Sequence, residues 1–123
     1  LQIRSRMGLP AGAALLHARA LHLSDAKPYA YEDRWINPAA VPALMEVDLS
    51  RISANAWLVR NVPYTKGSLS LFALEADAET AAILCCPMGA ALFIVERTTW
   101  MHDAPITCVR QVYPPGHRLM TDI

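Results

Sequence analysis

The 123-residue sequence has no long apolar run, and no segment approaches the roughly 18 consecutive apolar residues of a membrane-spanning helix. It also has no excess charge, because eleven basic residues balance eleven acidic ones. A domain without a basic surplus has no bulk attraction for a phosphate backbone, so we expect neither nucleic acid nor a membrane as a direct partner. The first residues lack an initiator Met and the apolar core of a signal peptide, and we expect the chain to be a piece of a longer protein.

Cysteine is scarce and badly placed for chemistry. The three cysteines include the adjacent pair Cys85 and Cys86, and no Cys-x-x-Cys spacing exists for zinc or redox work. Neighbouring cysteines rarely bridge. We expect all three to be small core hydrophobes of a protein in the reducing cytosol.

Motifs of catalysis are also missing. The sequence has no Gly-x-Ser-x-Gly elbow, no Gly-rich phosphate loop and no HExxH. Its four histidines are scattered, and His17 and His22, five apart, fall on opposite faces of a strand. We predict no enzymatic activity, no metal site and no cofactor.

What the chain does have is the composition of one globular domain, 54% apolar and 18% charged. Alternation and turn residues predict strands over 13–23, 29–36, 68–75, 91–100 and 106–113, with 119–123 as a candidate sixth. Short helices are expected over 40–47, 54–59 and 78–84, the last two capped by Ser53 and Asp77. The predicted class is α+β, an antiparallel sheet of five to six strands with short helices. Residues 1–12 read as the end of an interdomain linker.

The expected strand over 29–36 carries charges where a packing strand would carry Val or Ile. Glu32 and Arg34 share one face, while Asp33 and Trp35 share the other. Charges in mid-sheet are costly unless they are paired or face water or a ligand, which favours a binding site here. The plainer alternative is an ion pair on a wet sheet face, which is worth under about 1 kcal/mol.

A faint internal repeat supports a pocket. The turn Ser24–Pro28 and the strand that ends at Pro38 echo the turn at 102–105 and the strand that ends at Pro114. Two similar hairpins predict two halves joined in one sheet, with a pocket where they meet. Thr107 and Tyr113 share a face of the later strand, and His22 lies near the earlier turn.

Five segments, in order, carry a family resemblance: His22-x-x-Asp25, Glu32-Asp33-Arg34-Trp35-Ile36-Asn37-Pro38, Ile52-Ser53-Ala54-Asn55-x-Trp57-Leu58, Glu96-Arg97-Thr98-Thr99-Trp100, and Arg110-x-x-Tyr113-Pro114-x-Gly116-x-Arg118. Together they resemble the UTRA domain, the effector-binding half of GntR-superfamily bacterial repressors. The segments EDRWINPAAVP and ISANAWLV look most like the histidine-utilisation repressors. The resemblance covers residues 13–123.

The resemblance implies a fold similar to chorismate lyase. It also implies an N-terminal winged helix-turn-helix, absent from this chain, that binds operator DNA as a homodimer. The effector of the histidine-utilisation branch would be urocanate, an imidazole bearing a propenoate. The family's pocket positions, together with the neighbouring Arg34, give the expected ligand-binding residues: Ala20, His22, Glu32, Arg34, Ser53, Thr107 and Tyr113.

The roles that follow are specific. Glu32 would accept from a ligand N–H, and Thr107 and Tyr113 would hold a carboxylate with the help of the helix start at Ser53. Ala20 and His22 stand where sugar-phosphate sensors look arginine-rich, which disfavours a phosphate. A sensor for another carboxylate or an amino sugar phosphate, an enzyme of the chorismate-lyase type, and a dimerisation module without ligand stay open as alternatives.

Overall fold

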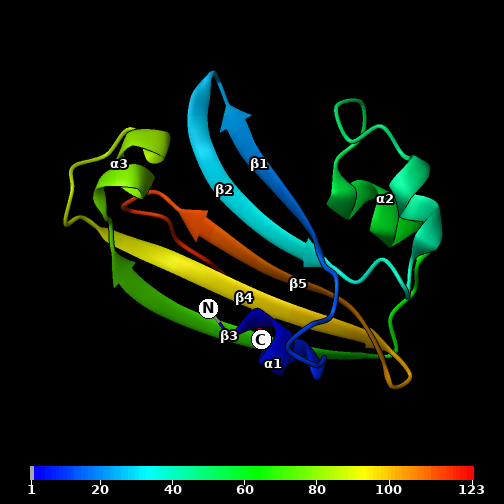
Figure 1. The fold of residues 1–123 in the computed structure, drawn as a ribbon. Helices are drawn as coiled ribbons and strands as arrows, with labels where there is room; N and C mark the ends of the chain where they lie inside the picture. Colours follow the sequence, from blue (N-terminus) through cyan, green and yellow to red (C-terminus); the bar gives the residue numbers. More distant parts are fainter. Residues whose placement is uncertain (1) are drawn as a thin grey trace.

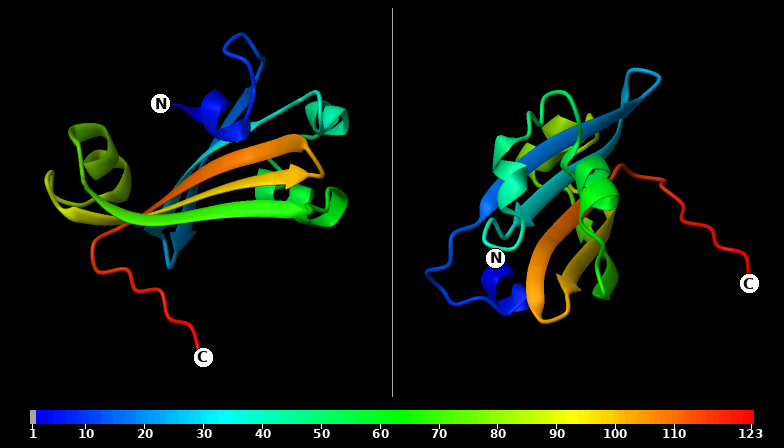
Figure 2. Two further views of the ribbon diagram at one scale, coloured as in Figure 1. Left: turned by 90° about the horizontal axis from the view of Figure 1, so that it is seen from below. Right: turned by 90° about the vertical axis from the view of Figure 1, so that its right-hand side faces the viewer.

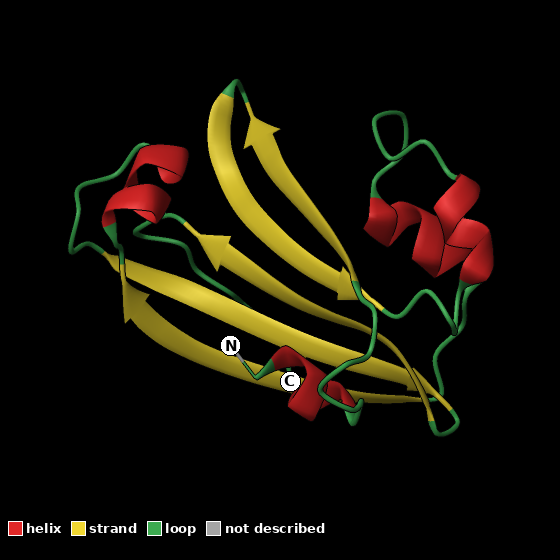
Figure 3. Cartoon of the chain, viewed as in Figure 1, coloured by secondary structure: helices red, strands yellow, loops and turns green. Residues whose placement is uncertain are grey.

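The computed structural model describes residues 2–123 and is built on one antiparallel sheet (Figures 1 and 3). Its five strands are β1 (Leu16–Ser24), β2 (Lys27–Ile36), β3 (Lys66–Glu75), β4 (Ala91–Met101) and β5 (Ala104–Tyr113). They lie in the order β1-β2-β5-β4-β3. The helical segments are short: α1 (Ile3–Met7), the 3-10 turn η1 (Pro42–Glu46), α2 (Ala54–Asn61) and α3 (Ala78–Leu84). The predicted α+β class with an antiparallel sheet is confirmed.

Two hairpins make most of the sheet, as the internal repeat predicts. Asp25 and Ala26, which connect β1 to β2, have φ values of 52° and 63°. This left-handed backbone suits the tight turns whose twist matches that of paired strands. His102, between β4 and β5, has a φ of 55°. Antiparallel pairing of β2 with β5, in which Arg34 faces Val109, joins the hairpins.

The helices divide between the two sides of the sheet (Figure 2). Strand alternation sends Glu32 and Arg34 to the side that η1 and α2 cover, where Leu58 packs with Ile36 and Leu44. We refer to it as the α2 face. The opposite face is covered by α1 and α3, and there Leu84 packs with apolar residues of β4 and β5. None of the helices among residues 2–123 is long and apolar enough to cross a membrane.

The N-terminal segment contains a helix, although the sequence indicated only the end of an interdomain linker. Ile3 and Met7 are four residues apart, so one helical turn places both on the same side. Their exposed fractions are 5% and 1%, and they pack against Cys108 on the opposite face. Helix α1 therefore covers part of the core by packing against β5 on that opposite face. The domain boundary at residue 13 stays a prediction.

Two further expectations are wrong. Residues 119–123 form no strand; they are exposed and lead away from the sheet (Figure 2). Pro114 and Pro115 explain this, because proline offers no N–H to a strand ladder and redirects the chain. Cys85 is not a core residue either: it lies exposed at the end of α3 with a φ of 55°, whereas Cys108 is buried.

Candidate functional site

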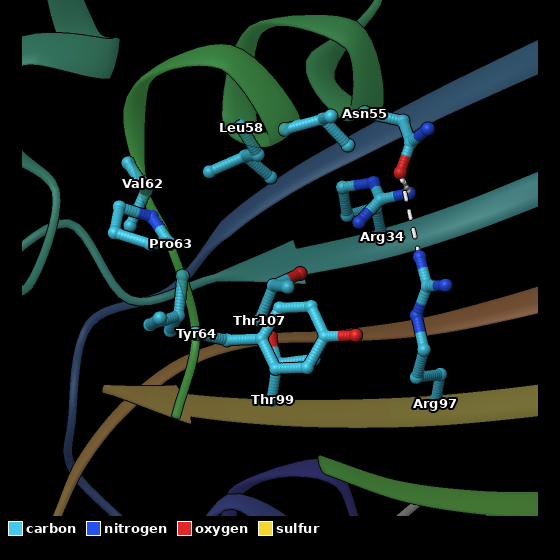
Figure 4. A pocket seen from close by; sticks show the side chains of 11 residues that line it. Arg34, Asn55, Leu58, Val62, Pro63, Tyr64, Arg97, Thr99 and Thr107 are labelled. Atoms are coloured by element: carbon cyan, nitrogen blue, oxygen red, sulfur yellow. Dashed lines mark hydrogen bonds between the residues drawn. The ribbon is translucent and has the colours of Figure 1, made fainter. Parts of the chain in front are cut away.

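A cavity of about 430 Å³ lies between α2 and the α2 face of the sheet (Figure 4). One wall is apolar, and Leu58, Val62, Pro63 and Ile106 contribute to it. The other wall is polar, and Arg34, Asn55, Arg97, Thr99 and Thr107 form it. An irregularity in the pairing of β4 with β5 places Ile106 between the partners of Thr99 and Trp100, so that Ile106 and Thr107 both border the cavity.

Arg34 is the most deeply placed charge of the polar wall, with an exposed fraction of 1%. Its Nε donates to Glu32 Oε2 at 3.2 Å, and its Nη2 donates to Asn55 Oδ1 at 3.2 Å. Burial lowers the pKa of Arg34, and the Glu32 carboxylate opposes that effect. An arginine nonetheless stays charged in proteins, so the cavity keeps a buried cation in its wall.

Glu32 lies beside Arg34 on the same face of β2 and is 3% exposed. Burial by itself would raise the pKa of its carboxyl, but the Arg34 guanidinium and the Gln111 amide more than offset this and hold the pKa below its usual range. Gln111 Nε2 donates to Glu32 Oε1 at 3.2 Å, and His22 Nε2 lies 3.7 Å from the same oxygen. Glu32 is therefore an ionised carboxylate that fixes Arg34.

The network continues toward the far end of the sheet. Tyr113 Oη donates to Gln111 Oε1 at 3.2 Å, and the Tyr113 ring stacks on His117 with centroids 4.0 Å apart. Burial, followed by the nearby Tyr29 and Glu32, raises the pKa of Tyr113, so its phenol stays neutral. Phe93 and Tyr29 complete an aromatic cluster at this end.

Arg97 enters the polar wall from β4, and Asn55 enters it from the first turn of α2 (Figure 4). Arg97 Nη2 donates to Asn55 Oδ1 at 3.4 Å, so this one amide oxygen accepts from two guanidinium groups. The Arg97 Nε atom is buried and has no hydrogen-bond partner within residues 2–123. None of the residues bordering the cavity, all in the described part of the chain, is acidic.

The structure brings most of the sequence-predicted residues to one face. Arg34 and Thr107 border the cavity, although the Thr107 hydroxyl donates to the Trp35 carbonyl at 2.9 Å. The other four on the α2 face lie beside it along the strands: Ala20, His22, Glu32 and Tyr113. Ser53 stands apart, because it is exposed and its hydroxyl accepts from Ala56 N at 3.1 Å as the helix cap.

Sequence reasoning missed Asn55, Arg97 and Gln111. Arg97 could have been identified as a site residue from the sequence, since it is a charged residue in mid-strand, as Arg34 is, and shares a face with Thr99. Asn55 was harder to identify, because its only distinguishing feature is that it is a polar residue among the apolar residues of the first turn of α2. Gln111 shares a strand face with Thr107 and Tyr113, but nothing in the sequence shows that it bonds to Glu32.

The opposite face holds a second set of charges. Glu96, next to Arg97 in β4, is 4% exposed and bonds to Arg6 of α1 and to Arg110, whose Nε donates at 2.7 Å. His17 stacks on Trp35 there, 4.7 Å between centroids, so His17 and His22 do lie on opposite faces. Within the described residues, no three His, Cys, Asp or Glu side chains gather as metal ligands would.

The UTRA domain family matches residues 2–117, and the chain belongs to this family. Among curated relatives, the histidine utilization repressor of Pseudomonas putida is 29% identical over 109 residues, which cover 88% of this chain and 44% of that protein. The histidine utilization repressor of Klebsiella aerogenes is 26% identical over 108 residues, covering 88% and 45%. The chain thus spans less than half the length of the curated relatives it matches.

Solved structures of GntR-type regulators share the fold of this chain. The C-terminal domain of the histidine utilization repressor from Pseudomonas syringae pv. tomato superposes with a TM-score of 0.87 at 25% identity, covering 98% of this chain and 86% of that one. The effector domain of PhnF from Mycobacterium smegmatis, at 22% identity, shares the fold with a TM-score of 0.80 over 95% and 73%. The resemblance to GntR-type regulators is confirmed. The two curated relatives are named as repressors, in agreement with the prediction that the chain is not an enzyme.

Proposed function

We propose that this chain is the effector-sensing domain of a histidine-utilisation repressor of the GntR superfamily. The observation that carries the proposal is the cavity beside α2, which combines an apolar wall with two arginines, the buried Arg34 and the half-buried Arg97, in a UTRA domain. Ligand sites are commonly concave, mostly apolar and supplied with a few well-placed polar groups. The names of the relatives supply the regulatory role.

The proposed effector is urocanate, a flat ring joined to a carboxylate by an unsaturated arm. Its ring would lie against the apolar wall, where the ring of Tyr64 projects toward the cavity (Figure 4). Its anionic end would face the polar wall. Arg34 and Thr107, which border the cavity, support this placement. Glu32 holds Arg34 in position, and Ala20, His22 and Tyr113 extend the same surface. The alternative is another small carboxylate or an amino sugar phosphate.

The regulatory step follows from linkage. In the intact protein, operator DNA would be read by a winged helix-turn-helix that precedes this domain, and the protein would act as a cytoplasmic homodimer. An effector changes DNA affinity only if it binds the DNA-bound and free geometries unequally. We therefore expect urocanate to lower operator affinity in the full-length repressor.

Ligand binding is tested with the chain itself by thermal shift and calorimetry. Urocanate at about 100 times its dissociation constant should stabilise the fold by about 2.7 kcal/mol. Histidine, glucosamine 6-phosphate and chorismate serve as competing candidates. Stabilisation by one of these, with no response to urocanate, would overturn the choice of effector.

Two tyrosine variants test where the effector binds. Tyr64 is 62% exposed at the cavity, and Tyr29 is 50% exposed at the aromatic cluster away from it. Loss of one aromatic contact typically costs about 0.5–1.5 kcal/mol, so Tyr64→Ala should weaken urocanate by about 2- to 10-fold. Tyr29→Ala should leave affinity unchanged. The reverse result would move the site to the Tyr113 end of the sheet.

A further inference from the structure

Two arginines of the cavity wall share one neutral acceptor. Arg34 and Arg97 both donate to Asn55 Oδ1, at 3.2 Å and 3.4 Å. We propose that Arg97, with Arg34 and Asn55, is the site that recognises the carboxylate of the effector. This inference rests on the proposed function, that a metabolite occupies the cavity, and adds the residues and the charge that select it.

The charges around the cluster do not balance. Glu32 neutralises Arg34 through the 3.2 Å ion pair. Arg97 has no such partner: within residues 2–123 no carboxylate lies at ion-pair distance from it. The adjacent Glu96 points to the opposite face, where Arg6 and Arg110 engage it. The cavity therefore carries one uncompensated positive charge in a partly apolar setting, where attraction for an anion is stronger than in water.

The hydrogen bonds of Arg97 are also incomplete. A guanidinium presents its donors as a planar fork that matches the two oxygens of a carboxylate. Arg97 uses Nη2 on Asn55, while its Nε is buried without a partner in the described chain. An amide oxygen serves as a single neutral acceptor for both arginines. A ligand carboxylate would offer two charged oxygens and satisfy the orphaned Nε.

Charge also separates a carboxylate from a phosphate. A single uncompensated guanidinium matches a monoanion, whereas a phosphate monoester carries about −1.5 to −2 at neutral pH. The hydroxyls that the sequence suggested for this role already have partners: Thr107 donates to Trp35, Tyr113 donates to Gln111, and Ser53 caps α2. The anionic end of the ligand is thus assigned to the two guanidinium groups.

The decisive experiment compares urocanate with its primary amide, which has the same shape but no charge. Affinities are measured by calorimetry for the wild type, Arg97→Gln and Arg97→Lys. The control is Arg60→Gln, which removes an equal charge from the exposed end of α2 outside the cavity. Circular dichroism checks that each variant is folded. If Arg97→Gln proves to be unfolded, Arg97→Lys still tests the proposal.

We expect Arg97→Gln to weaken urocanate by about 10- to 100-fold, the usual worth of a charge-assisted hydrogen bond. It should bind the amide as the wild type does, and so lose the preference for acid over amide. Arg97→Lys should keep part of that preference, and Arg60→Gln all of it. An unchanged preference in both Arg97 variants would overturn the carboxylate site while leaving the proposed function intact.

The opposite failure is equally distinguishable. A wild-type protein that ignores urocanate contradicts the choice of effector, and the same variants are then examined with imidazolepropionate, cinnamate and inorganic phosphate. Stabilisation by a carboxylate that depends on Arg97 supports the site without urocanate. Binding of phosphate in preference to every carboxylate, or no binding that depends on Arg97, overturns the inference.

Discussion

Replacing Asn55 with aspartate should imitate the bound carboxylate from within the protein. The side chains have nearly the same shape, and the new oxygen would stand 3.2 Å from Arg34 and 3.4 Å from Arg97, where the amide oxygen lies now. A hydrogen bond to a charged partner contributes about 1.5–3 kcal/mol, and adding a second charge increases it further, so we estimate a gain of about 0.5–1 kcal/mol for each bond. The combined gain is about 1–2 kcal/mol, which corresponds to a rise in Tm of about 3–8 °C for a domain of this size.

A second acidic variant isolates this effect. Position 55 lies in the first turn of α2, where any carboxylate is stabilised by about 0.3–1 kcal/mol through the helix dipole. Ala56→Asp introduces the same charge one residue later, at a position that does not border the cavity. Differential scanning calorimetry should give Asn55→Asp the higher Tm of the two, and urocanate should no longer raise it. Equal Tm values, or a full urocanate response in Asn55→Asp, would refute the reasoning.

Other predictions concern the fold and its charges. Ser53→Ala should lower the free energy of unfolding by about 1 kcal/mol through loss of the helix cap, measured in urea, without changing urocanate affinity; a loss of affinity would return Ser53 to the site. Because the pKa of Glu32 is lower in the folded than in the unfolded protein, the carboxylate stabilises the fold above the unfolded pKa of about 4.3. That stability is lost as the pH falls through the folded pKa. Urea midpoints should therefore drop on acidification, and Glu32→Gln should reduce that pH dependence. Glu96→Gln should cost about 2 kcal/mol, since its two arginine partners lose a buried carboxylate, whereas Asp48→Asn at an exposed pair should leave the urea midpoint unchanged.

The strands and the class of fold could be predicted from the sequence because they depend on local pattern. The run from Ala91 to Trp100 alternates clearly, and β4 covers it. Helix α3 begins where Asp77 and Glu79 mark a helix start, and the Asp77 side chain accepts from Thr80 N at 2.8 Å. Helix α1 could not be predicted in this way. Its Ile3 and Met7 gain their stability from Cys108, about a hundred residues later, and Gly and Pro nearby resemble a linker.

The candidate site was predicted in part for the same reason. Mid-strand charge identified Glu32 and Arg34, and strand alternation placed Thr107 and Tyr113 on one face of their own strand. Only the family resemblance grouped the two pairs, and the structure places both on the α2 face. The contacts between α2 and the strands could not be predicted from the sequence, because they depend on how α2 lies over the sheet. The sequence indicated Ser53 as the polar group of that helix, but a cap residue directs its hydroxyl back to its own backbone. Asn55, two residues on, reaches Arg34 instead.

The position of β5 has a consequence for how the chain acquires its structure. This strand is the last to be synthesised among those described, yet it lies in the middle, between β2 and β4. Until it emerges from the ribosome, the inner edge of β2 is unpaired, and Arg34 lacks its neighbour Val109. Pairings so distant along the chain slow folding, and open strand edges invite association with other chains. A nascent polypeptide that stops before residue 104 thus holds two separate sheet fragments, and the cavity wall closes only when the final strand is inserted.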